Sequence, residues 1–194
     1  MLKLGLSVCC RARDFRRDAR GMAAVEFAMI LPMMLMILFG TIQVSTGVAV
    51  DRKVTVLTRT ISDLISQASS ITDTDISNSF AMGAAIMTPY SSTPMKAKIS
   101  QIYIDPTTLV AKVKWSKATN TSAHACNEVV TVPTGLAIGG TYLIMSEVNY
   151  DFQPVVGFNI NLGFASPVFP FSETTYTRPR QTSKVNYPTA PTCT

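Results

Sequence analysis

A long uncharged run near the N-terminus constrains this chain more than any other feature. Phe27 to Val50 are twenty-four consecutive residues without a charged side chain, and Glu26 is the only charge in the thirty residues between Arg20 and Asp51. About 20 apolar residues span a bilayer as a helix, whereas an ordinary secretory signal has an apolar region of roughly 7 to 15 residues. The sequence therefore predicts one retained membrane-spanning helix; cleavage as a secretory signal after Ala49 is the alternative.

The charges around this run predict its orientation. Residues 1–20 hold six of the 17 Lys and Arg, and residues 22–194 hold eleven against ten Asp and Glu. The positive-inside rule then keeps the N-terminus in the cytoplasm and places the chain from about Asp51 onward on the other side. Basic residues concentrated before an apolar run, without interleaved aromatics on a folded face, argue against a nucleic-acid partner.

The pattern beyond the membrane predicts an α+β fold. Apolar residues continue at three- and four-residue spacing after Asp51, which indicates an amphipathic helix over 51–68 and one continuous helix from about Ala23 to Ala68. We expect four segments: a cytoplasmic basic leader over 1–21, a transmembrane helix over 22–50, its amphipathic continuation over 51–68, and an extracytoplasmic α+β domain over 69–194.

The domain itself is expected to contain a short helix and a small antiparallel sheet. Asp75 is expected to cap a helix that ends near Thr88, because Pro89 disfavours helical geometry before it. Alternating apolar residues from Leu109 to Trp115 indicate a strand with one apolar face, which forms a hairpin with 97–104 through the turn at 105–108. Further strands are expected over 142–152 and 174–178. The amphipathic helix would cover the apolar face of this sheet.

Residues 152–172 carry no charge, which raises the question of a second membrane span. Three prolines would leave too many backbone groups unpaired in lipid, so a second span is rejected. Four phenylalanines in this stretch are instead expected to pack as core, with a surface contacting membrane or another subunit as the alternative: Phe158, Phe164, Phe169 and Phe171.

The four cysteines divide by compartment. Cys9 and Cys10 would lie in reducing cytoplasm, whereas Cys126 and Cys193 would both lie outside it, where disulfides persist. We predict that Cys126 and Cys193 are bridged.

The charge of Glu26 needs an explanation, because a lone carboxylate in a membrane helix costs roughly 2.5 to 3.5 kcal/mol. If a peptidase cuts after Gly21, Met22 becomes a new N-terminus and Glu26 lies one helical turn below its amine. The amine can then pair with Glu26 of the same chain or of a neighbouring subunit. In the alternative, the chain is uncleaved and Glu26 only reaches the cytoplasmic surface near Arg20.

The stretch GMAAVEFAMILP at 21–32 resembles the N-terminal signature of the TadE/TadG-like family of bacterial tight-adherence (Flp pilus) systems. TYTRPR at 175–180 is a second, weaker likeness. The resemblance implies a type IV prepilin-like processing site between Gly21 and Met22, with Glu26, Phe27 and Pro32 as assembly residues; processed members commonly have tyrosine where this chain has Phe27. It further implies a minor pilin or pseudopilin of a pilus assembly and secretion machinery, located in the inner membrane with a periplasmic domain. Its partners would be the membrane, a prepilin peptidase, and other pilus subunits.

Few residues suggest enzyme chemistry. His124 is the only histidine and is expected to be an exposed loop residue, while a metal site would need three or four convergent ligands. We therefore expect no enzyme activity, no catalytic residues, no metal, no cofactor and no small-molecule substrate. The remaining alternative is an unprocessed bitopic protein whose outer domain is a tethered hydrolase or ligand-binding module.

Overall fold

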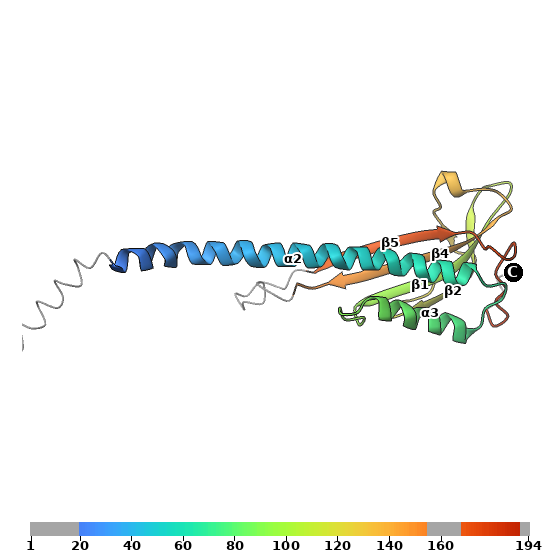
Figure 1. The fold of residues 1–194 in the computed structure, drawn as a ribbon. Helices are drawn as coiled ribbons and strands as arrows, with labels where there is room; N and C mark the ends of the chain where they lie inside the picture. Colours follow the sequence, from blue (N-terminus) through green and yellow to red (C-terminus); the bar gives the residue numbers. More distant parts are fainter. Residues whose placement is uncertain (1–19, 155–167, 191–194) are drawn as a thin grey trace, which may run out of the picture.

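The computed structural model describes residues 20–154 and 168–190. One helix dominates it: α2 runs from Arg20 to Ser66, through the uncharged run and into the domain (Figure 1). The helix begins three residues before the expected start at Ala23 and ends two residues before the expected end at Ala68. One helix in the described part of the chain is long and apolar enough to cross a membrane, with a mean hydropathy of 2.2 in its most apolar window.

The second half of α2 is held by an apolar stripe on the side that faces the sheet. The stripe recurs at three- and four-residue spacing, which is the spacing of one helix face; its buried members are Val50, Val54, Leu57, Ile61 and Ile65. Leu64 follows Ile61 at the same three-residue spacing, but it is only half-buried. The amphipathic continuation of the apolar helix is thus an element that covers the sheet.

The sheet has five antiparallel strands in the order β3-β2-β1-β4-β5. Their bounds are β1 Met95–Ile104, β2 Ala111–Thr119, β3 Val129–Val130, β4 Tyr142–Phe152 and β5 Phe169–Thr177. The expected hairpin is confirmed: Asp105 accepts hydrogen bonds from the backbone N–H groups of Thr107 and Thr108 in the turn between β1 and β2. The two-residue β3 and a 3₁₀ turn, Thr134–Leu136, were not expected from the sequence.

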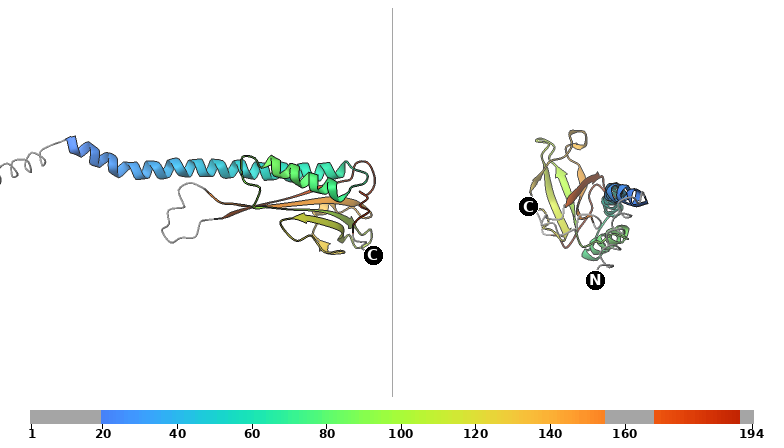
Figure 2. Two further views of the ribbon diagram at one scale, coloured as in Figure 1. Left: turned by 90° about the horizontal axis from the view of Figure 1, so that it is seen from below. Right: turned by 90° about the vertical axis from the view of Figure 1, so that its left-hand side faces the viewer.

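A second helix, α3, spans Asp73–Ile86 and lies beside α2 (Figure 2). Its N-cap is Thr72, whereas Asp75 occupies the third helical position and accepts a hydrogen bond from the Thr72 backbone N–H, so that the two residues form a capping box. The expectation that Asp75 itself caps the helix was therefore wrong. The Lys53 ammonium of α2 donates to the Ile86 and Thr88 carbonyls, 2.8 Å each, and so fixes the other end of α3.

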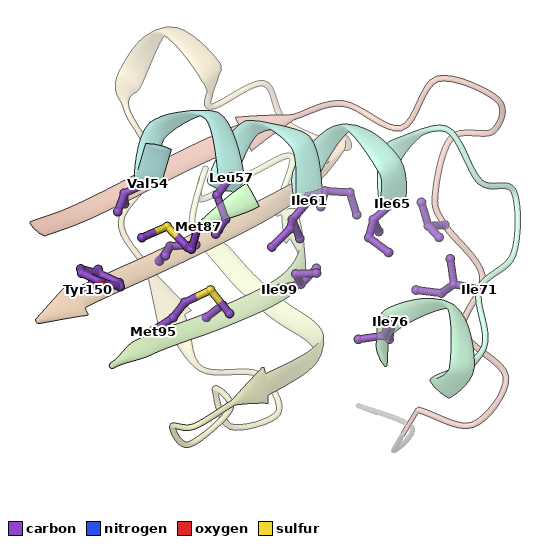
Figure 3. Packing of buried hydrophobic residues seen from close by; sticks show 14 of the residues in the cluster. Val54, Leu57, Ile61, Ile65, Ile71, Ile76, Met87, Met95, Ile99 and Tyr150 are labelled. Atoms are coloured by element: carbon purple, nitrogen blue, oxygen red, sulfur yellow. The ribbon is translucent and has the colours of Figure 1, made fainter. Parts of the chain in front are cut away.

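The main core lies between the two helices and one face of the sheet. It joins the α2 stripe to residues of α3, β1, β2 and β4 (Figure 3); among them are Ile76, Ile99, Trp115, Ile144 and Tyr150. The Trp115 indole donates to the Gln101 side-chain oxygen, which pairs the polar atom of a buried ring. This arrangement confirms the expected α+β fold with a long N-terminal helix on a small antiparallel sheet.

A bulge divides the expected apolar face of β2. The register steps from Gln101↔Trp115 to Ile102↔Val113, so Lys114 is the extra residue. Ala111 and Val113 consequently join a second cluster with Ile102 and Leu143 rather than the core around Trp115. Leu109, expected on the same face, is 53% exposed at a positive φ of 56°.

Candidate assembly and processing site

The first half of α2 projects from the domain without cover from the described chain. Every residue from Gly21 to Leu38 is exposed, including Met22 at 64% and Phe27 at 58%. Figure 1 shows this part of the helix extending away from the sheet and from α3. A helix that is apolar on all sides and exposed on all sides needs surroundings other than water.

The predicted processing and assembly residues all lie on this projecting part. Glu26 follows Met22 at the spacing of one helical turn, and both side chains are exposed. Gly21 is already inside the helix, and a Cβ built on it would meet no other atom within 4 Å.

Pro32 lies inside α2, and the helix continues through it. Proline removes one hydrogen bond from the helix interior, and the first turns are inclined to the rest of the helix in Figure 2. Two hydroxyls of the uncharged run are paired within the helix: Thr41 donates to Ile37 and Thr46 to Ile42, 2.8 Å each. This pairing suits their placement in an apolar solvent.

The TYTRPR segment lies against the C-terminal end of α2. Arg180 forms an ion pair with Asp63, and its backbone N–H donates to the Ser66 carbonyl at 2.9 Å. Ser62 donates to the Thr177 hydroxyl at 2.8 Å. The segment therefore packs against the end of the helix opposite to the predicted processing residues.

His124 is not the exposed loop residue that was expected. Its ring lies between Glu128 and Glu147, at 3.0 Å from Nδ1 and 2.5 Å from Nε2, and its side chain is 13% exposed. Burial of the ring opposes protonation, but the hydrogen bonds to Glu147 and Glu128 outweigh it, so the pKa of His124 is raised above its ordinary value. The same contact lowers the pKa of Glu128.

Cys126 takes part in a disulfide bond. Its predicted partner Cys193 lies outside the described residues, as do Cys9 and Cys10, so the pairing stays a prediction. Among the described residues, no group of three or more His, Cys, Asp or Glu is placed to hold a metal ion.

The four phenylalanines expected as core are only partly accounted for. Phe169 is 51% exposed and Phe171 half-buried at the core margin, so Phe169 is not a core residue. Phe158 and Phe164 lie outside the described residues. The described sheet ends at Phe152 and Phe169, on the side from which α2 projects. Beyond this point no described strand packs against the helix stripe.

Comparison with known proteins gives one match. Residues 21–61 match the family model of TadE-like proteins. This range begins at the predicted processing glycine and ends at Ile61, a buried residue of the α2 stripe. No curated protein and no solved structure gives a significant match to the chain.

Proposed function

We propose that the chain is a membrane-anchored minor pilin or pseudopilin of the Tad system, because residues 21–61 match the model of TadE-like proteins, a family of Tad pilus-associated components. The observation that carries the proposal is the position of the matched range. It covers the exposed apolar half of α2 and most of the stripe that packs on the sheet. Such a helix presents an outward surface to lipid or to other subunits and couples it rigidly to a folded domain.

In this proposal the prepilin peptidase cuts between Gly21 and Met22 in the membrane. Glu26 then pairs with the new Met22 amine, on its own chain or a neighbouring one, and Phe27 and Pro32 take part in contacts along the projecting helix. The partners are the membrane, the peptidase, and other pilus or pseudopilin subunits of the secretion machinery. The domain lies in the periplasm and the basic leader in the cytoplasm.

The test is the N-terminus of the mature chain. We expect mass spectrometry of protein extracted from cells with an active prepilin peptidase to find a chain that begins at Met22. Gly21→Val should block cutting, because its β-branched side chain hinders the extended backbone, while Gly40→Val, at an equally open glycine of the same helix, should be cut normally. A chain that begins at Met1 would contradict the proposal of processing.

Glu26→Gln separates cutting from assembly. The variant should be cut, since Gly21 is intact, but should incorporate poorly into the assembled complex because the Met22 amine lacks its carboxylate. Normal incorporation would mean that Glu26 only reaches the membrane surface.

The alternative, a hydrolase or ligand-binding module on a tether, makes the opposite prediction for the anchor. Replacing residues 22–50 with an unrelated membrane segment should abolish assembly if contacts of this helix matter. A tethered module would keep its function after the same replacement.

A further inference from the structure

The end of the β4–β5 ribbon lies beside the part of α2 that precedes Asp51. A Cβ built on Gly47 would be 3.8 Å from the Phe152 ring and 3.9 Å from the Phe171 ring. A cleft of about 430 Å³ separates ribbon and helix and is lined on the helix side by Gly40, Val44 and Val48. Phe152, Pro154 and Phe169 line the opposite wall.

Helix length fixes the depth of this cleft if α2 crosses a bilayer. A hydrocarbon core of about 30 Å takes about 20 residues at 1.5 Å each. Counted from Glu26, the boundary on the domain side falls near residue 46, and the first charge beyond it is Asp51. By either boundary Val44 and Gly40 lie roughly 3 to 16 Å inside the hydrocarbon region, and the wall that faces them lies at the same depth.

The chemistry of the ribbon end suits that depth. Residues 152–154 and 168–172 contain no charged side chain. The nearest charges on the two strands are Asp151, which pairs with Lys96 at 2.8 Å, and Glu173. Val168 and Phe169 are 46% and 51% exposed, although they are large apolar residues.

Many backbone hydrogen-bonding groups at this end of the ribbon are also paired or absent. β4 and β5 pair as far as Phe152↔Phe169, and Pro154 and Pro170 have no N–H group to leave unpaired. The described residues at this end therefore add few unpaired donors when they enter the leaflet to a shallow depth.

We propose that the end of the β4–β5 ribbon, formed by Phe152, Pro154, Val168, Phe169 and Phe171, enters the leaflet beside α2, so that lipid acyl chains fill the cleft. The inference rests on the proposed membrane anchoring of α2. Lipid is the occupant because one wall of the cleft is the membrane helix itself. The domain is then held to the bilayer at two places, which restricts how far α2 and the domain can tilt together.

The experiment uses the full chain in phosphatidylcholine vesicles that carry bromine on the acyl chains, which quenches tryptophan in contact with them. Phe169→Trp and Val168→Trp place a reporter at the ribbon end. Ile138→Trp is the control at the opposite end of the sheet, where Gly140 bonds to Ile104. The wild-type chain gives the baseline, because its single tryptophan, Trp115, is buried in the domain core.

We expect a blue shift and loss of emission for Phe169→Trp and Val168→Trp but not for Ile138→Trp. Emission at both positions like that of Ile138→Trp overturns the inference. A blue shift without quenching by brominated lipid also overturns it, because a second protein chain then covers the ribbon end.

Met36→Trp, in the middle of the apolar run, tests the premise separately. If Met36→Trp is quenched while the ribbon reporters are not, only the entry of the ribbon fails. If Met36→Trp is not quenched either, the membrane anchoring of α2 fails, and the proposed function fails with it.

Discussion

His124 joins the loop before β3 to the face of β4. Its ring contacts Glu128 in the loop and Glu147 on the strand, and Glu128 also accepts from the backbone N–H of Ala125 at 2.7 Å. Because the pKa of His124 is raised in the folded state, the contacts of its protonated ring stabilise the fold fully below its ordinary pKa near 6.5. This stabilisation is lost as the pH rises through the pKa of the folded state. The lowered pKa of Glu128 gives a contribution that is lost as the pH falls below about 4.5 and through the folded value.

We therefore expect the His124 contacts to stabilise the domain most between about pH 4.5 and 6.5. In that window His124→Gln should lower the free energy of unfolding by about 1 kcal/mol, the upper range of exposed ion pairs. The difference between variant and wild type should shrink as the pH rises above 6.5, measured by denaturant unfolding of the detergent-solubilised chain. Since this is the only histidine, a wild-type stability that stays level from pH 6 to 8 would contradict the assignment.

The sequence could not reveal this contact. Glu147 is 23 residues from His124, and only the pairing of β1 with both β2 and β4 brings their segments together. By contrast, Gly21, Glu26 and Pro32 are close in sequence, and one helix places them without any tertiary information. The sequence therefore predicted that these residues lie on one helix, but it could not predict contacts across the sheet.

The two helices approach each other closely at Gly83. A Cβ built there would be 3.0 Å from the Ile61 side-chain end and 3.5 Å from Leu57. The spacing of Ile76, Phe80 and Met87 in the sequence indicates which face of α3 is apolar, but not that a glycine on this face allows the close approach. Packing distance depends on the partner helix, which the periodicity of α3 does not describe.

Gly83→Leu should destabilise the domain by about 1 to 3 kcal/mol, because overpacking forces α3 away from α2. Ala85→Leu places the same side chain on an exposed position of the same helix and should change stability by less than about 0.5 kcal/mol. Thermal or denaturant unfolding of both variants makes the comparison. Equal effects would mean that the helices adjust their spacing freely.

At the scale of the sheet, the alternation of apolar and polar residues predicted β1, β2 and β4. The strand predicted over 174–178 starts five residues after the observed start of β5 at Phe169. The bulge at Lys114 was not predictable, because alternation in β2 continues through it in sequence while the side chains change faces. Residues Ala111 and Val113 find their cover in the segment around Val130 and Leu136, which has no strand pattern of useful length.

At the scale of the whole molecule, the chain after β5 packs against the connection between α2 and α3. Asn186 donates to the Ser69 carbonyl and accepts from Ile71, and Tyr187 donates to Asp73, which with Lys117 lowers the pKa of Asp73 to about 2. Tyr187 also stacks edge-on against Trp115 with ring centroids 5.4 Å apart. The C-terminal segment is thus part of the domain core.

If Cys126 pairs with Cys193, the disulfide fixes this segment covalently. Closing a loop of that length stabilises the folded state by about 4 kcal/mol on the chain-entropy estimate. Cys126→Ser should then lower the free energy of unfolding by up to that amount, and peptide mapping of the native protein without reductant should link the two cysteine peptides. Recovery of Cys193 as a free thiol from native membranes would exclude the pair.

The orientation of the whole molecule is predicted to depend on the leader. Its positive charge resists transfer across the membrane, whereas residues 51–70 carry only three basic side chains, of which Lys53 is already bound to the end of α3. Neutralising the five leader arginines should make a fraction of chains invert or fail to insert. These residues are Arg11, Arg13, Arg16, Arg17 and Arg20. Protease digestion of the outer domain in spheroplasts detects the change. Neutralising Arg52 and Arg59 instead strengthens the asymmetry and should leave digestion unchanged. If the leader variant is digested like wild type, the folded domain rather than charge sets the topology.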